Sequence, residues 1–145
     1  MAGPHDISGR CLCGAVTFTA KAAGSDVGAC HCSMCQRWAA GPMLALGIDA
    51  GSLKIADGAS LGAYQSSEWG ERLFCKACGT PLFWRSLDGQ HAFVSAGALN
   101  DRSGLQLASQ IYIDEKPSYY EFANDTVKMT GAEFAAMMTA GTKKD

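Results

Sequence analysis

Three cysteines within six residues, in the stretch 30–35 (CHCSMC), constrain this chain more than any other feature. In an extended segment, residues i and i+2 point to the same face, so we expect Cys30 and Cys32 to reach one ion together. The Cys-x-x-Cys turn that follows brings Cys35 toward them. Zinc held by thiolates is normally tetrahedral, and a site with only three protein ligands keeps its fourth position for water or substrate. The stretch therefore predicts a reactive zinc site.

His31 lies between two of these cysteines in the sequence. By the same alternation its side chain points away from the ion. One interpretation makes His31 a fourth ligand or a proton carrier. The interpretation that the alternation favours is a histidine that forms hydrogen bonds on the far side of the loop.

The other four cysteines form two pairs in distant parts of the chain, each followed by glycine: Cys11-Leu12-Cys13-Gly14 and Cys75-Lys76-Ala77-Cys78-Gly79. Such a glycine permits a left-handed backbone, which lets nearby amides point at the thiolates. Two such pairs are typical of a closed structural zinc site with no position for substrate. Structural zinc contributes about 10–16 kcal/mol, as much as the ~5–15 kcal/mol stability of a whole domain. We therefore expect loss of this ion to unfold the core.

Division of the seven cysteines into a four-cysteine site and a three-cysteine site is one of several groupings that they allow. Cys32 and Cys35 with Cys75 and Cys78 would make an ordinary zinc ribbon. That grouping leaves the other three cysteines without a site. The cysteine count alone therefore favours four plus three.

Length and composition are those of an ordinary globular domain. The chain has 145 residues, 48% hydrophobic and 18% charged, with a net charge of −2. A chain of this size can bury a hydrophobic core, so we expect a single domain over residues 1–145. No basic patch or run is apparent, which argues against a nucleic-acid partner.

The sequence carries no sign of secretion or of a membrane partner. Residues 1–6 lack the basic region and apolar stretch of a signal peptide. No run approaches the ~18 apolar residues that a membrane span needs. In a reducing compartment, clustered cysteines are typical of metal sites before disulfides. We expect a cytoplasmic protein.

Short segments broken by Gly, Asp and Ser indicate an all-β fold of several small sheets. The segment 16–20 alternates apolar and hydroxyl residues with a period of two, as half-buried strands do. Asp88-Gly89 favours a hairpin turn. Further strands are predicted at 43–48, 61–65, 72–75, 81–85, 92–96, 110–113 and 119–122.

A short helix is predicted near the C-terminus. The run 130–133 (TGAE) forms a capping box, across which Met129 can contact Phe134. Phe134, Met137 and Met138 then follow at helical spacing and form one apolar face. Packing on the β-core explains this face better than a methionine-rich cofactor site.

Three ordered motifs, 9–16 (GRCLCGAV), 30–35 (CHCSMC) and 72–80 (RLFCKACGT), closely resemble the glutathione-dependent formaldehyde-activating enzyme family, which includes centromere protein V. The resemblance covers about residues 7–122, the expected core of the domain. It implies a zinc-containing β-tent fold of several small antiparallel sheets, with two zinc ions per chain. It assigns a structural zinc to Cys11, Cys13, Cys75 and Cys78, and a catalytic zinc to Cys30, Cys32 and Cys35.

The resemblance also implies an activity, that of a carbon-sulfur lyase. The family reaction reversibly joins formaldehyde and glutathione to S-(hydroxymethyl)glutathione, so the partners would be a small thiol and a small aldehyde. Two positions differ from the family pattern. Gln110 stands where a histidine often precedes an apolar-aromatic strand, and Tyr119 lies near where tryptophan is common. We expect the substrate contacts at these positions to differ from those of the family.

Candidate groups for holding an anionic thiol substrate lie near the motifs. The cations are Arg37, Arg72 and Lys76, and the hydroxyl groups are Ser66 and Ser67. Each of these residues is equally compatible with an ordinary surface charge or a turn.

The three-cysteine site admits three functional hypotheses. Zinc deprotonates a coordinating thiol, and the thiolate, the reactive form of sulfur, could add to an aldehyde carbon. The second hypothesis is a non-catalytic zinc module for a protein partner, with His31 or water in the fourth position. The third is thiol redox chemistry at Cys32 and Cys35, for which no βαβ context is recognisable.

Overall fold

The computed structural model describes residues 3–143, which form two compact units. Of the described residues, 3–27 and 45–106 form unit 1, and 28–44 and 107–143 form unit 2. Strands β2 (Thr17–Cys30) and β3 (Met43–Ile48) each begin in one unit and end in the other. The single domain over residues 1–145 stays a prediction.

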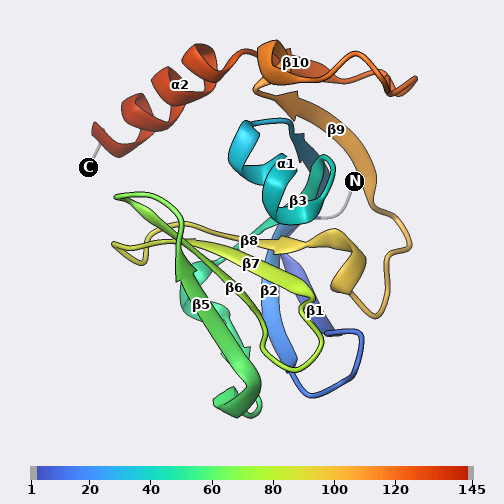
Figure 1. The fold of residues 1–145 in the computed structure, drawn as a ribbon, viewed down its shortest axis with the longest axis vertical. Coiled ribbons are helices and arrows are strands. Elements are labelled where there is room, and N and C mark those ends of the chain that lie inside the picture. Colours follow the sequence, from blue (N-terminus) through green and yellow to red (C-terminus); the bar gives the residue numbers. More distant parts are fainter. Residues whose placement is uncertain (1–2, 144–145) are drawn as a thin grey trace. The chain divides into compact units, whose positions relative to one another are not determined.

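Unit 1 is built from antiparallel strands. Strands β3, β8, β7, β6 and β5 pair in that order, and β2 pairs with β1 and with β4 (Figure 1). Its core contains the rings of Phe18 and Phe83, which meet edge to face with centroids 4.8 Å apart. The remaining bounds are β1 His5–Arg10, β4 Lys54–Ile55, β5 Leu61–Gln65, β6 Gly70–Cys75, β7 Pro81–Ser86 and β8 Ala92–Ser95, with 3₁₀ helices η1 Ala50–Ser52, η2 Gly58–Ser60 and η3 Ala96–Ala98.

Unit 2 combines helices with two parallel strands (Figure 1). The amide of His31, just after β2, donates to the carbonyl of Ile111 at the end of β9 over 3.1 Å. This bond joins the stretch 30–35, which carries three cysteines, to β9. The elements are α1 Ser33–Ala39, β9 Gln106–Ile111, η4 Ile113–Glu115, β10 Val127–Met129 and α2 Gly131–Lys143.

The fold is mainly β with a short C-terminal helix, as predicted. The predicted strands 43–48 and 61–65 have the observed bounds. Gly89 adopts a φ of 76°, and its amide donates to the carbonyl of Ser86, which confirms the predicted turn. The helix α2 begins at the predicted capping box, where Thr130 and Glu133 exchange bonds of 2.8 and 3.1 Å between backbone and side chain.

Two local predictions were wrong. Residues 119–122 do not form a strand, because a turn follows Pro117 and the ring of Tyr120 packs on His31 instead of extending along a sheet. The stretch after Cys32 is not only a loop. Cys32 caps α1, since its sulfur accepts from the amide of Cys35 over 3.3 Å.

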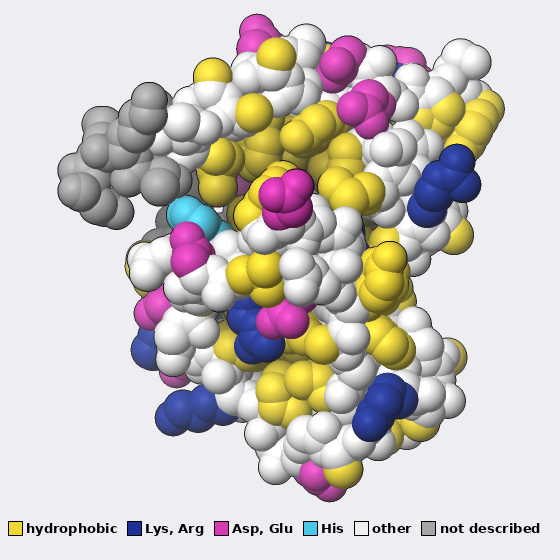
Figure 2. Space-filling model, turned by 60° about the vertical axis from the view of Figure 1, so that its left-hand side comes forward, with side chains coloured by type: hydrophobic (Ala, Val, Ile, Leu, Met, Phe, Trp, Pro, Cys, Tyr) yellow, Lys and Arg dark blue, Asp and Glu magenta, His cyan; other side chains and the backbone are white. Residues whose placement is uncertain are grey.

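The charged side chains are dispersed on the face drawn in Figure 2. Lys and Arg side chains stand apart from one another there, with Asp and Glu side chains among them. None of the helices described in residues 3–143 has the length and apolar character needed to cross a membrane.

Candidate metal centres

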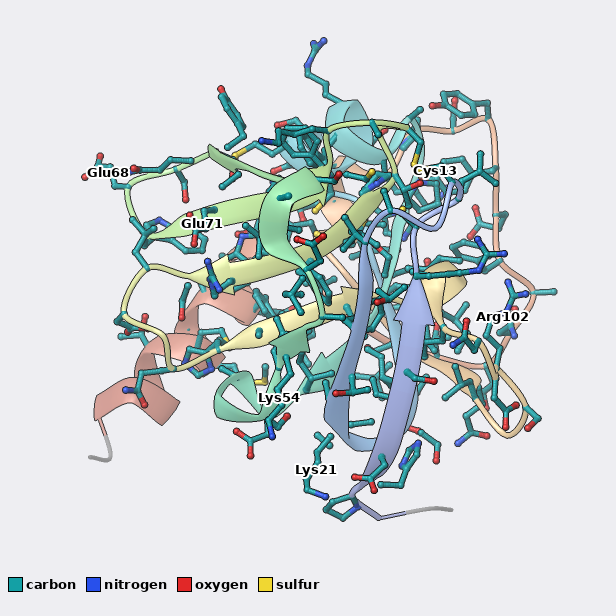
Figure 3. All side chains as sticks on the ribbon, turned by 90° about the horizontal axis from the view of Figure 1, so that it is seen from below. Cys13, Lys21, Lys54, Glu68, Glu71 and Arg102 are labelled. Atoms are coloured by element: carbon teal, nitrogen blue, oxygen red, sulfur yellow. The ribbon has the colours of Figure 1, made fainter. Side chains whose placement is uncertain are left out.

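Unit 1 brings four cysteines together from two stretches of the chain that are more than 60 residues apart. Cys13 lies on the loop between β1 and β2 (Figure 3), and Cys75 ends β6. The Sγ atoms of Cys11, Cys13, Cys75 and Cys78 all lie within 4.8 Å of one another. The Sγ–Sγ distances from Cys13 are 3.7 Å to Cys11 and 3.8 Å to Cys75. Zinc–sulfur bonds of about 2.3 Å in a tetrahedron place sulfur atoms ~3.8 Å apart, so these donors fit a zinc ion.

The two halves of this centre have matching turns. Gly14 and Gly79 follow the second cysteine of each pair with φ of 85° and 83°, the left-handed backbone that the sequence predicts. A short backbone pairing closes each turn, through the amide of Cys11 to the carbonyl of Val16 and the amide of Cys75 to the carbonyl of Thr80. Each pair is therefore positioned by its own local chain.

Thr80 connects the two halves. Its Oγ1 accepts from the amide of Leu12 over 3.0 Å and lies 3.1 Å from Sγ of Cys78. Because the amide already donates to this oxygen, the hydroxyl hydrogen is available to the sulfur. The hydroxyl of Thr80, followed by the amides of Cys13 and Thr80, lowers the pKa of the Cys78 thiol to about 5. The side chain thus favours the thiolate, the form that binds metal.

Unit 2 brings the other three cysteines together at the start of α1. The Sγ atoms of Cys30, Cys32 and Cys35 all lie within 4.8 Å of one another. Cys32 and Cys35 are buried, whereas Cys30 is partly exposed. Cys30 is therefore the most exposed residue of the three. Met43 completes the buried cluster.

Crowding of the three thiols disfavours their ionisation in the absence of a cation. Hydrogen bonds with Cys32 and then Cys35, together with burial, strongly raise the pKa of Cys30. A bound divalent ion would instead favour the thiolate form of these cysteines, because a coordinating thiol is deprotonated. The donor set of three soft sulfur atoms fits zinc with one position left for another ligand. None of the seven cysteines forms a disulfide.

Two aromatic side chains lie next to the three-cysteine group. Trp38 of α1 and Tyr112, which follows β9, both pack against the buried cluster and are themselves partly exposed. Tyr112 has φ 55° and ψ 42°. This left-handed backbone costs a non-glycine residue of order 1–3 kcal/mol. Burial, followed by the charges of Cys32 and Cys30, raises the pKa of Tyr112, so its phenol stays protonated.

His31 lies outside the sulfur group, in a buried hydrogen-bonded chain. Its Nε2 lies 2.9 Å from Oε1 of Gln110, whose Nε2 donates to Oγ1 of Thr126 over 2.9 Å. Its Nδ1 lies 2.7 Å from the hydroxyl of Tyr120. Because the Gln110 amide nitrogen donates to Thr126, its oxygen accepts from His31, and Nδ1 of the neutral ring accepts from Tyr120. This arrangement agrees with the histidine hydrogen-bonded away from the ion.

Sequence reasoning missed the residues that brace the three-cysteine loop. The carboxylate of Glu115 accepts from the amide of Ser33 over 2.8 Å at the start of α1. Gln36 donates to the carbonyls of His31 and Glu115. Tyr112, Trp38 and Met43 were also missed as neighbours of the sulfurs. No local pattern indicates the contacts of Glu115 and Tyr112, since they join parts of the chain about 80 residues apart.

The predicted substrate-holding residues fall in different units. Arg37 is exposed in the last turn of α1, in unit 2. Arg72 is buried in unit 1, where its Nε donates to Oγ of Ser66 over 3.1 Å. Lys76 is exposed within the four-cysteine turn, and the carbonyl of Ser67 accepts from Gln65. Of these five, only Arg37 belongs to the unit that carries the three-cysteine group.

Comparison with known proteins identifies the relatives of this chain. Residues 6–115 match the family of glutathione-dependent formaldehyde-activating enzymes. The chain belongs to this family.

Two relatives of this formaldehyde-activating family member support the assignment. A Schizosaccharomyces pombe protein described as an uncharacterized lyase is 32% identical over 126 residues, covering 86% of this chain and 91% of the relative. A crystal structure of a Rhodobacter sphaeroides protein superposes with a TM-score of 0.57 at 25% identity, covering 69% of this chain and 91% of that one.

Part of unit 2 lies beyond the matched region of the formaldehyde-activating family. The match ends at residue 115, whereas α2 spans Gly131–Lys143. The amide of Gly131 donates to Oδ1 of Asp114 over 2.9 Å, and the ring of Phe134 packs on Tyr112. The C-terminal segment of this family member therefore contacts a residue beside the three-cysteine group.

Proposed function

We propose that this chain is a zinc-dependent carbon-sulfur lyase that joins or splits a glutathione-like thiol and a small aldehyde. One observation carries the proposal: the sulfurs of Cys30, Cys32 and Cys35 converge, with Cys30 partly exposed, in a member of the formaldehyde-activating family. The relative described as a lyase supports the reaction class. The seven free thiols fit a reducing compartment, and we propose a cytoplasmic location.

We propose that the chain binds two zinc ions, and the two donor sets support this number. Cys30, Cys32 and Cys35 would hold the catalytic ion, and the four cysteines of unit 1 would hold the structural ion. The catalytic ion, when bound, supplies the positive charge that favours the thiolate of an incoming thiol. The chain itself supplies the aromatic side chains of Trp38 and Tyr112, against which a small aldehyde can lie.

Arg37 is the candidate in unit 2 for binding the carboxylates of a glutathione-like thiol. It is exposed on the helix that begins at Cys32. Charge-assisted hydrogen bonds from a guanidinium to a carboxylate are about twice as strong as neutral ones. We expect Arg37→Ala to raise the KM for glutathione and to leave the KM for formaldehyde unchanged.

Exchange spectroscopy by NMR tests the reaction directly. Glutathione and formaldehyde equilibrate with their adduct in buffer, and the protein should accelerate this exchange. Cys35→Ala should abolish the acceleration while the melting temperature of unit 1 stays unchanged. If the wild-type protein leaves the exchange rate as it is in buffer, and glutathione does not change the spectrum of the cobalt-substituted protein, the lyase proposal fails. A non-catalytic zinc module for a protein partner then becomes the better hypothesis.

A further inference from the structure

Tyr112 combines two unusual features at one position. Its backbone is left-handed although it is not glycine, with φ 55° and ψ 42°. Its ring packs against the cluster of Cys32, Cys35 and Met43. Costly backbone conformations persist only where the surrounding structure holds them, and they concentrate at functional sites. The neighbours of Tyr112 must therefore hold its backbone in this conformation.

The C-terminal helix holds the ring. A Cβ atom at Gly131 would lie 2.5 Å from Cε2 of Tyr112, so only glycine lets the start of α2 approach this closely. The ring of Phe134 lies 6.1 Å from that of Tyr112 at an interplanar angle of 57°. The bond from the amide of Gly131 to Asp114 fixes α2 to η4, directly after Tyr112. The ring is thus confined between α2 and the cysteine cluster.

The Tyr112 phenol differs from the other two phenols of unit 2. The hydroxyl of Tyr120 is already engaged with Nδ1 of His31 at 2.7 Å. Tyr119 is 79% exposed. The hydroxyl of Tyr112 has no hydrogen-bond partner among the described side chains of residues 3–139. Its partly exposed ring and the partly exposed Cys30 both pack against the cluster of Cys32, Cys35 and Met43. Its oxygen can therefore serve a ligand that reaches the three sulfurs.

We propose that Tyr112 is a catalytic residue of the three-cysteine site, donating a hydrogen bond from its phenol to the aldehyde oxygen, and that α2 holds it there. This inference rests on the proposed lyase function. In the joining direction, the thiolate sulfur forms a bond to the carbonyl carbon, and the π electron pair moves to oxygen. The phenol proton moves to that oxygen, and the proton lost by the thiol returns to Tyr112 through water. Thiol and aldehyde thus give the hydroxymethyl thioether without another reactant.

The splitting direction follows by reversal. The Tyr112 phenol first passes its proton to water, and the resulting phenolate accepts the hydroxyl proton. The carbon–sulfur bond then breaks with its electron pair on sulfur, which takes up the proton that water received. Donors aimed at a developing oxyanion typically contribute about 10²–10³-fold in rate. Because thiol binding does not involve the aldehyde oxygen, loss of the phenol should affect turnover and not thiol affinity.

Tyr112→Phe tests the phenol, with Tyr119→Phe as the matched control. With glutathione and formaldehyde, we expect Tyr112→Phe to lower kcat about 100-fold. Zinc content and the glutathione-induced spectrum of the cobalt-substituted protein should stay unchanged, and Tyr119→Phe should match the wild type. A kcat for Tyr112→Phe within about twofold of an active wild type would overturn the role of Tyr112 alone. An inactive wild type would overturn the lyase function together with it.

Gly131→Ala tests the positioning by α2, with Gly41→Ala as the control, since a Cβ at Gly41 meets nothing within 4 Å. Alanine favours helix over glycine, so a weaker helix would not explain a loss. In protein carrying ¹³C-labelled tyrosine, the signal that Tyr112→Phe removes should shift in Gly131→Ala, and kcat should fall at least about tenfold. If neither the tyrosine signal nor kcat changes in Gly131→Ala, the role of α2 is contradicted.

Discussion

The hydroxyl oxygen of Thr80 lies 3.1 Å from Sγ of Cys78 and also accepts a hydrogen bond from the amide of Leu12. One side chain thereby connects two cysteine turns that are more than 60 residues apart in the sequence. Hydrogen bonds to metal ligands orient them and typically change metal affinity 10–100-fold. Thr80 therefore prepares the four-cysteine group for an ion.

Removal of the Thr80 hydroxyl should weaken zinc retention. Thr80→Val keeps the shape of the side chain and loses both hydrogen bonds, so we expect zinc to leave the four-cysteine site about tenfold faster. Thr80→Ser keeps the hydroxyl and should behave as the wild type. A chromogenic chelator measures both rates. Equal rates for valine and serine at this position would show that the hydroxyl has no effect on the ion.

The two metal sites should differ in lability. Protein expressed with ample zinc should hold up to two ions per chain, one at the four-cysteine group and one at the three-cysteine group. The site with three protein ligands keeps an exchangeable position. A mild chelator should therefore remove one ion first. A single ion per chain, or two ions lost at the same rate, would contradict this division.

Serine substitutions in the two cysteine groups should differ in how much they lower the melting temperature. Cys75→Ser breaks a link between distant segments of unit 1, whereas Cys32→Ser alters a local turn in unit 2. Because a structural zinc ion contributes as much as a whole domain's stability, we expect Cys75→Ser to lower Tm by at least about 10 °C. Cys32→Ser should lower it by less than about 5 °C. Calorimetry of both variants measures the difference. Equal Tm values would contradict the assignment of the structural ion to the four-cysteine group.

Gln110 should contribute to the free energy of unfolding through its buried hydrogen bond to His31. It is 2% exposed, and its oxygen accepts from the buried ring of His31. Gln110→Ala leaves that donor unsatisfied, which should lower the free energy of unfolding by about 1–3 kcal/mol. Gln106→Ala, at an exposed glutamine on the same strand, is the control. Chemical denaturation compares them, and similar losses at both positions would argue against the buried chain.

Local rules anticipated much of the architecture. The strand bounds of β3 and β5 followed from short apolar segments, and the start of α2 followed from its capping box. These features depend on residues two to four positions apart. The strand expected at 119–122 failed because Lys116 and His31 engage the Tyr120 segment, and no periodicity within the segment reveals those partners.

The sequence by itself determined which residues can hold metal, because cysteine spacing and the following glycines set each turn locally. Tertiary structure decided what surrounds them. It brought Thr80 to Leu12, Gln110 to His31, and Tyr112 between α2 and the sulfurs. Most of these contacts join segments distant in the chain, and their formation depends on how strands and helices pack. Spacing therefore predicts the ligands, whereas packing selects the neighbours that control their chemistry.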